Sequence, residues 1–275
     1  MNSLQDCAVL HNGVQMPWVG LGVYKVKEGD EVKSAVRTAL EVGYRHIDTA
    51  AFYENEEGVG QAIRESGIPR EQVFVTTKVW NTDQGYETTL KAFDASLKKL
   101  RFDYVDLYLV HWPVKGKYKE TYKALEKLYK DGYVRAIGVS NFQIHHLKDV
   151  MADCEIKPMV NQVEYHPRLT QKELQSFCQE NGIQLEAWSP LMRGEILTEP
   201  TIVEIGKKYG KTPAQVVLRW DLQHGVVTIP KSVTPARIKE NADLFGFSLT
   251  EEEMKRIDAL NLNKRIGADP DNFNF

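Results

Sequence analysis

The chain alternates short apolar runs with longer amphipathic stretches along its length, and this alternation limits its possible folds more than any other feature. Eight runs are rich in β-branched and other apolar residues, as expected of strands: Trp18–Gly22, Tyr44–Thr49, Val73–Val79, Tyr104–Val110, Val134–Val139, Met159–Val163, Ile183–Trp188 and Val226–Ile229. Helical stretches lie near residues 30–42, 56–66, 86–100, 118–131, 143–153, 170–181, 200–210, 213–223 and 235–244. Strand–helix alternation predicts a mostly parallel sheet that is covered by helices.

Eight strand–helix units can close into a (β/α)8 barrel, and an open doubly wound sheet is the alternative. Uniformly short, apolar strands favour the closed barrel, because both faces of such strands are buried. The segments Gly20-Leu-Gly22 and Gly58-Val-Gly60 each lack the third glycine of the dinucleotide-binding fingerprint found in open sheets. We therefore predict one (β/α)8 TIM barrel domain over residues 1–275.

Two segments lie outside the repeating units. Val9–Met16 places Asn-Gly between alternating residues, which predicts an N-terminal β-hairpin that plugs the bottom of the barrel. Thr250–Leu260 has the pattern of an extra C-terminal helix, with Thr250 as its cap and Glu253 at the capping-box position. The tail, Asn261–Phe275, has no periodic pattern and is expected to be irregular.

Charge and cysteine usage exclude several functional classes. The net charge is −3 with both signs interspersed, so no basic groove for nucleic acid or anionic lipid is expected. No apolar stretch approaches the roughly 18 residues of a membrane helix, and the N-terminus lacks the pattern of a signal peptide. Cys7, Cys154 and Cys178 are widely spaced and form no disulfide or zinc pattern. We expect a cytoplasmic protein, a monomer, without a metal, nucleic-acid or membrane partner.

Polar and aromatic side chains collect where the predicted strands end, which is where (β/α)8 enzymes build their active sites. In chain order they are Asp48 and Tyr53, Lys78 and Trp80, His111 and Trp112, Ser140 and Asn141, Gln162, Trp188 and Ser189, and Lys231 and Ser232. Each alone has an ordinary structural explanation, such as a turn cap, a packed aromatic ring, a snorkelling lysine or a core histidine. A barrel brings all of them to one end, which predicts a site.

Four of these residues form a chemically coherent group. A buried Lys78 needs a counter-ion, which Asp48 can supply. The ammonium beside a phenol should lower the pKa of Tyr53 from about 10, so that the phenol can donate a proton to a developing alkoxide. His111 can hydrogen-bond the substrate oxygen. No Ser or Cys is visibly paired with a base, so the group suits proton transfer coupled to hydride transfer.

Four segments resemble the signatures of the aldo-keto reductases, in order and over essentially the whole chain. They are Gly43-Tyr-Arg-His-Ile-Asp-Thr-Ala-Ala-Phe-Tyr53 with the following Glu54–Gly60, Leu107-Tyr-Leu-Val-His-Trp-Pro113, Ile137-Gly-Val-Ser-Asn-Phe142 and Ile229-Pro-Lys-Ser232. The chain is most similar to bacterial members that reduce small aldehydes, the glyoxal, methylglyoxal and 2,5-diketogluconate reductases. The resemblance implies an NADPH-dependent oxidoreductase whose catalytic tetrad is Asp48, Tyr53, Lys78 and His111.

The resemblance also implies residues that bind NADPH or NADP+. Ser140, Asn141 and Gln162 would hold the nicotinamide carboxamide, and Trp188 would stack on the ring where many relatives carry tyrosine. The other implied cofactor contacts are Gly22, Val23, Tyr24, Ser189, Leu191, Lys231, Ser232, Val233, Thr234, Arg237, Glu240 and Asn241. Lys231 and Arg237 favour NADPH, because its 2′-phosphate needs positive partners.

Substrate size follows from the same resemblance. Tyr24, Trp80, His111 and Trp112 would line the pocket, and the segment after Trp112 and the tail are both short. An open pocket is therefore expected, suited to small aldehydes and 2-oxoaldehydes such as methylglyoxal and consistent with aldehyde detoxification. Two alternatives remain at this point: a Schiff-base lyase that uses Lys78 as its nucleophile, and a non-catalytic scaffold that binds NADPH.

Overall fold

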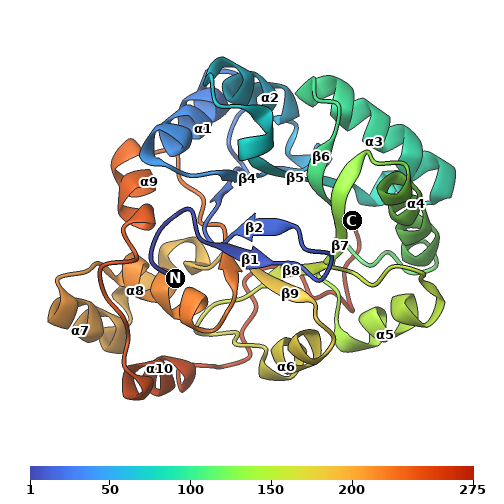
Figure 1. Cartoon of the computed structure of the whole chain (residues 1–275). Coiled ribbons are helices and arrows are strands. Elements are labelled where there is room, and N and C mark those ends of the chain that lie inside the picture. Colours follow the sequence, from blue (N-terminus) through green and yellow to red (C-terminus); the bar gives the residue numbers. More distant parts are fainter.

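The computed structural model describes all 275 residues, and its strands form a ring surrounded by helices (Figure 1). The parallel sheet has the order β10-β9-β8-β7-β6-β5-β4-β3, so each strand lies beside the next one in the chain. Its strands are β3 (Leu21–Gly22), β4 (His46–Asp48), β5 (Phe74–Val79), β6 (Val105–Val110), β7 (Val134–Ser140), β8 (Val160–Glu164), β9 (Gln184–Trp188) and β10 (Val227–Thr228). All eight predicted strands are confirmed.

The first and last strands of the sheet meet and close the barrel. Val19 bridges to Thr228 and Gly22 bridges to Lys231, both in the parallel sense. The Gly20 N–H donates to the Thr228 carbonyl at 2.9 Å. The prediction of a (β/α)8 barrel in place of an open sheet is therefore confirmed.

Helices follow the strands in alternation and cover the outside of the ring (Figure 1). They are α1 (Asp30–Val42), α2 (Glu56–Glu65), α3 (Tyr86–Leu100), α4 (Tyr118–Lys130), α5 (Ile144–Asp153), α6 (Lys172–Glu180), α7 (Pro200–Tyr209), α8 (Pro213–Gln223) and α9 (Pro235–Ala242). Thr212 caps α8 by accepting from the Gln215 N–H, and Pro213 fills the first helical position. None of the helices is long and apolar enough to span a lipid bilayer.

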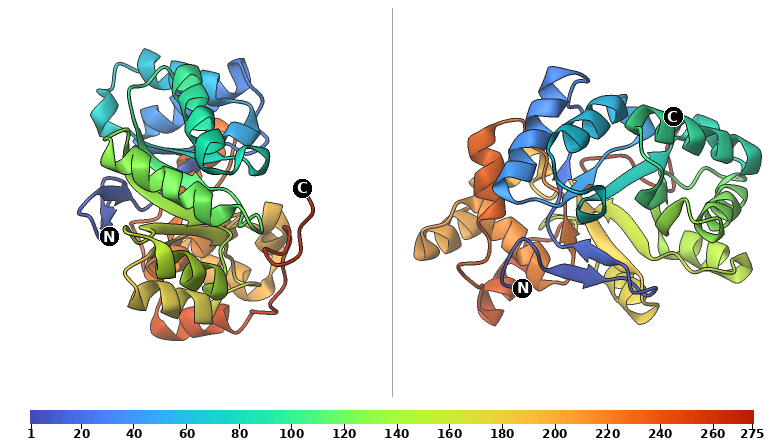
Figure 2. Two further views of the ribbon diagram at one scale, coloured as in Figure 1. Left: turned by 90° about the vertical axis from the view of Figure 1, so that its right-hand side faces the viewer. Right: turned by 45° about the horizontal axis from the view of Figure 1, so that its top comes forward.

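The predicted additions to the barrel are also present. Strands β1 (Cys7–Val9) and β2 (Gln15–Pro17) pair antiparallel and lie across the bottom of the barrel, with Met16 fully buried (Figure 1). Helix α10 (Glu251–Asp258) begins with the expected capping box of Thr250 and Glu253. The tail beyond it forms no helix or strand, and it ends on the face opposite the hairpin (Figure 2).

The two pairs of glycines have a packing role. A Cβ atom on Gly20 would lie 2.7 Å from the His46 ring, and one on Gly22 would lie 2.8 Å from the Ile229 carbonyl oxygen. On Gly60 it would lie 2.2 Å from the Leu100 carbonyl oxygen. Gly20 therefore leaves room for the His46 ring, Gly22 lets the closing strands approach, and Gly60 lets α2 pack closely against the end of α3.

Replacing Gly60 with alanine should destabilise the protein. Alanine is favoured over glycine inside a helix by about 1 kcal/mol, but overpacking at a rigid backbone contact costs about 1–3 kcal/mol. Urea unfolding should therefore give a lower free energy of unfolding for Gly60→Ala. Gly246→Ala is the control, because nothing lies within 4 Å of its added Cβ. A Gly60→Ala protein more stable than the wild type would show that α2 and α3 do not approach this closely.

Candidate active site

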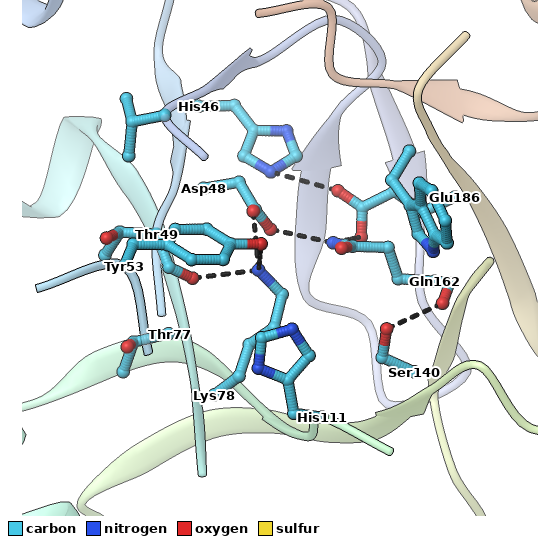
Figure 3. Close-up of polar contacts among 12 residues, drawn as sticks. His46, Asp48, Thr49, Tyr53, Thr77, Lys78, His111, Ser140, Gln162 and Glu186 are labelled. Atoms are coloured by element: carbon cyan, nitrogen blue, oxygen red, sulfur yellow. Dashed lines mark hydrogen bonds and ion pairs between the residues drawn. The ribbon is translucent and has the colours of Figure 1, made fainter. Parts of the chain in front are cut away.

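Side chains on alternate positions of each strand point into the barrel, and at its carboxyl end these inward side chains are polar. Asp48 on β4, Lys78 on β5, Gln162 on β8 and Glu186 on β9 are all buried. They converge on one layer of the barrel interior (Figure 3). Barrel interiors are usually filled by branched apolar side chains, so a polar layer marks a functional position.

Lys78 is the centre of this layer and has no exposed surface. Its Nζ donates to Asp48 Oδ1 at 2.6 Å, to the Thr49 carbonyl at 2.9 Å and to the Tyr53 hydroxyl oxygen at 3.2 Å. Burial alone lowers the pKa of Lys78, but Asp48 and Tyr53 raise it by more, so the net pKa lies above its ordinary value. The side chain is therefore a fully hydrogen-bonded ammonium group.

Tyr53 lies on a short 3-10 turn, Ala51–Tyr53, directly after β4. Because Lys78 donates to its oxygen, the phenol hydrogen remains free for another acceptor. Burial raises the pKa of Tyr53 to about 12 and outweighs the opposing effect of the Lys78 ammonium. The expectation that Lys78 lowers this pKa below its ordinary value is therefore wrong. Tyr53 keeps its proton at neutral pH.

His111 follows β6 and is packed among aromatic rings. Its ring centre lies 5.8 Å from that of Tyr53 and 5.2 Å from that of Trp80. Burial, together with the charge on Lys78, lowers the pKa of His111 well below its ordinary value, so the imidazole is neutral. Its Nδ1 is buried without a hydrogen-bond partner, which leaves Nε2 as the nitrogen available to a substrate.

The predicted carboxamide-binding residues form one connected group beside the tetrad. Ser140 Oγ donates to the Gln162 carbonyl at 2.8 Å, and Asn141 Nδ2 donates to the His111 carbonyl at 3.0 Å. The Trp188 ring nitrogen donates to Asn141 Oδ1 at 2.8 Å. The ends of β6, β7, β8 and β9 thus position the five residues relative to one another.

The predicted adenosine-end residues follow β10 and occupy the start and the end of α9. Lys231 and Arg237 are exposed, and neither forms an ion pair with an acidic side chain. Ser232 Oγ accepts from the Thr234 N–H at 3.1 Å, just before α9 begins. This stretch therefore offers free positive charge beside a helix N-terminus, an arrangement that suits phosphate.

The remaining residues that were predicted to contact the cofactor differ in their exposure to solvent. Val23 has no exposed surface, and its backbone N–H donates to the Asp48 carbonyl at 3.2 Å. Tyr24 is exposed, and its ring centre lies 5.1 Å from that of Tyr53. The others are spread around the same end of the barrel: Gly22 in β3, Ser189 and Leu191 after β9, Val233 before α9, and Glu240 and Asn241 at the end of α9.

The C-terminal tail contributes aromatic rings to the mouth of the barrel. Trp80 stacks between Phe52, at 3.8 Å between ring centres, and Phe275, at 5.9 Å. Trp112 packs against Phe273 and Phe275, at 5.2 and 5.1 Å. The tail, although short, therefore reaches the predicted pocket residues Trp80 and Trp112 and covers part of their rings.

Glu164, at the end of β8, fixes the tail in place. Its carboxylate accepts from the Ile266 N–H at 3.0 Å and from the Gly267 N–H at 2.6 Å. A Cβ atom on Gly267 would lie 2.3 Å from the Trp188 ring. The tail therefore packs directly against the indole that was predicted to stack on the nicotinamide.

Sequence reasoning missed two buried members of the polar layer, His46 and Glu186. Glu186 interrupts the apolar run Ile183–Trp188 in the same way that Lys78 interrupts its own strand, so a usable signal was present. The tail rings, Phe273 and Phe275, carry no such signal, because their position depends on the path of an irregular segment.

Comparison with known proteins places the chain among oxidoreductases. Residues 19–262 match the Aldo/keto reductase family. The chain is 63% identical over 273 residues to the glyoxal reductase of Bacillus subtilis, with 99% of each chain covered. It is 47% identical to the methylglyoxal reductase DkgA of Escherichia coli K12, with 96% of each covered.

Solved structures agree with these sequence matches. The chain superimposes on the aldo-keto reductase MGS-M4, from a deep-sea metagenome library of the Medee basin, with a TM-score of 0.95 and 50% identity, covering 98% of this chain and 100% of the other. A variant of Gox0644 in complex with NADPH gives a TM-score of 0.94 and 44% identity, covering 98% and 99%.

Removing one partner of the buried ion pair should be more damaging than removing both. Lys78→Met leaves the Asp48 carboxylate buried without its counter-ion, which should lower the free energy of unfolding by about 3–5 kcal/mol. Adding Asp48→Asn should recover part of that loss, because an amide needs no counter-ion. Urea unfolding of both single variants and the double variant measures the coupling. Strictly additive losses would show that the two groups do not interact.

Proposed function

The chain belongs to the aldo/keto reductase family, and on this premise we propose that it reduces small aldehydes and 2-oxoaldehydes, such as methylglyoxal, to alcohols with NADPH. Tyr53 is the proposed general acid, and Asp48, Lys78 and His111 complete the catalytic tetrad. The proposal includes the sequence-based expectation that residues 1–275 act as one barrel domain, as a monomer in the cytoplasm.

The contact between the Lys78 ammonium and the Tyr53 oxygen, at 3.2 Å, carries this proposal. A general acid must hold a proton and must also tolerate losing it. Burial keeps the pKa of Tyr53 at about 12, so the proton donor is loaded at neutral pH. The ammonium then stabilises the negative charge left on the phenol oxygen after transfer, and Asp48 keeps the lysine charged and in place.

The residues at the mouth fit NADPH. Ser140, Asn141 and Gln162 would hold the carboxamide group, and Trp188, against which the tail packs, would offer an aromatic face to the nicotinamide. Lys231 and Arg237 offer the unpaired positive charge that a 2′-phosphate requires. Bound NADPH would supply the hydride, and the neutral His111 would orient the carbonyl oxygen toward Tyr53 by donating from Nε2.

The aromatic mouth supports a small, electron-poor substrate. Tyr24, Trp80 and Trp112 present flat apolar surfaces, and Phe273 and Phe275 narrow the space that remains. A carbonyl beside a second carbonyl accepts hydride more readily than a plain alkanal. The names of the similar glyoxal and methylglyoxal reductases support the same substrate class.

A Schiff-base lyase is not favoured. Such an enzyme needs a neutral lysine as its nucleophile. Lys78 is instead an ammonium whose pKa Asp48 and Tyr53 raise above the ordinary value despite burial, and its three hydrogen bonds use all three of its protons. A scaffold that only binds NADPH would have no need for this buried arrangement.

Tyr53→Phe should nearly abolish reduction while leaving NADPH binding close to normal. The change removes the donated proton and keeps the ring, and general acid catalysis contributes roughly 10²–10⁴-fold. The measurement is NADPH consumption with methylglyoxal, together with an NADPH binding titration of both proteins. Near-normal turnover in the variant would remove Tyr53 from its role. A wild-type protein that reduces neither methylglyoxal nor any other small aldehyde would contradict the proposed function itself.

Arg237→Ala should weaken NADPH binding more than NADH binding. The guanidinium can make a charge-assisted contact with the 2′-phosphate, which only NADPH possesses. Dissociation constants of both cofactors for the wild type and the variant give the result. Arg256→Ala is a matched control, since Arg256 is a half-buried residue on α10 that pairs with Glu204, away from α9. Equal weakening of the two cofactors in Arg237→Ala would indicate a packing role.

A further inference from the structure

Glu186 lies in the barrel interior, two residues before Trp188 on β9, and has no exposed surface. Its Oε2 accepts from Gln162 Nε2 at 3.0 Å, and its Oε1 lies 3.5 Å from His46 Nε2 (Figure 3). It makes no ion pair with a lysine or arginine. A buried carboxyl group is costly if it is charged and unpaired, and the cost falls when the group is neutral and hydrogen-bonded.

We propose that Glu186 is a positioning residue, held as a neutral acid by His46, that fixes the Gln162 amide in the orientation needed to bind the carboxamide of the cofactor. The inference rests on the proposed function, because that function places the nicotinamide beside Gln162. Glu186 itself acts through Gln162 and is not proposed to touch the cofactor.

The hydrogen bonds of Gln162 allow only one orientation of its amide. Nε2 has two hydrogens, and it donates one to Asp48 Oδ2 at 2.7 Å and the other to Glu186 Oε2 at 3.0 Å. A flipped amide would direct its oxygen at the Asp48 carboxylate, which can only accept. The oxygen Oε1 is therefore left as the polar atom available to an N–H of the carboxamide.

The geometry around His46 places a proton on Glu186. His46 Nδ1 lies 3.1 Å from the Pro17 carbonyl, which only accepts, so Nδ1 carries a hydrogen. In a neutral ring Nε2 is then an acceptor, and it faces Glu186 Oε1 at 3.5 Å. Neither atom has a hydrogen-bond partner elsewhere. Two acceptors so placed repel each other, whereas a protonated Glu186 can direct its O–H from Oε1 toward His46 Nε2.

The alternative is an imidazolium facing a carboxylate, and the surroundings disfavour it. Burial raises the pKa of Glu186, and the negative charge of Asp48 raises it further, while burial lowers the pKa of His46 to about 4. The other charged groups facing the pair are Lys78, which already bonds Asp48, and Asp106, which acts on His46. Separating charge in this dry layer would be expensive, so the neutral pair prevails.

Two variants separate this role from a purely structural one. Glu186→Gln keeps the hydrogen bond with Gln162 and the polar contact with His46, because its oxygen can accept from Gln162 and its N–H can face His46 Nε2. Glu186→Leu has a similar volume but makes neither contact, so the Gln162 amide loses an anchor. The probes are NADPH, which carries the nicotinamide, and 2′,5′-ADP, which has only the adenosine end.

In Glu186→Leu we expect NADPH affinity and kcat with methylglyoxal to fall about tenfold or more, as for one buried hydrogen bond left unmade. Affinity for 2′,5′-ADP should stay unchanged, and Glu186→Gln should restore NADPH affinity and kcat to near wild-type values. Equal weakening of both ligands in Glu186→Leu, or no weakening of either, would overturn the proposal. So would a Glu186→Gln protein as impaired as Glu186→Leu.

A spectroscopic measurement keeps the proposal testable if Glu186→Leu fails to fold. The infrared difference between the wild type and Glu186→Gln near neutral pH should contain the carbonyl stretch of one protonated carboxylic acid. Its absence would overturn the neutral-acid assignment. Failure of the proposed function is distinguishable, because the wild-type protein would then neither bind NADPH nor reduce aldehydes.

Discussion

The site depends on keeping one ammonium group charged in a place that water does not reach. Burying an ion costs on the order of several kcal/mol, and Lys78 is tolerated because Asp48 and two neutral oxygens surround it. Asp48 must itself be held in position, and Gln162 does this by donating a hydrogen bond to it. Gln162 is positioned by Glu186, which in turn lies against His46. The polar layer thus extends from the catalytic end of the barrel to strand β2 of the hairpin at its base.

The barrel, and the clustering of the four residues of the proposed tetrad, could be predicted from the sequence because both depend on simple regularities. Strand and helix positions follow from the spacing of apolar residues, because the strands of a barrel are buried on both faces and its helices on one. The tetrad follows from a topological rule, since every parallel strand ends at the same side of the barrel. Asp48 and His111 are far apart in sequence, yet the rule alone places them in one site.

The features that could not be predicted depend on opposing energetic effects of similar size, or on the route of segments without regular secondary structure. The sequence predicts that Lys78 lowers the pKa of Tyr53, but burial raises this pKa by more, and the sequence pattern does not show how deeply the phenol is buried. Gly60 belongs to a pair that resembles a fragment of a phosphate-binding motif, while its neighbour in space is a carbonyl of another helix. Phe275 reaches Trp80 only because the tail follows one specific route across the mouth.

The closure of the barrel between β3 and β10 affects the order in which the protein folds. The Asp48–Lys78 contact joins residues 30 apart on neighbouring strands. The Gln162–Asp48 contact joins residues 114 apart. The closure between β3 and β10 joins the two ends of the sheet and so has the largest separation in sequence. Contacts that are distant in sequence form late, because the entropy of closing a long loop must be overcome first. A growing chain can therefore assemble the ion pair early but exposes an unpaired edge at β3 until β10 has been synthesised. Unpaired strand edges of this kind make partly folded chains prone to aggregation.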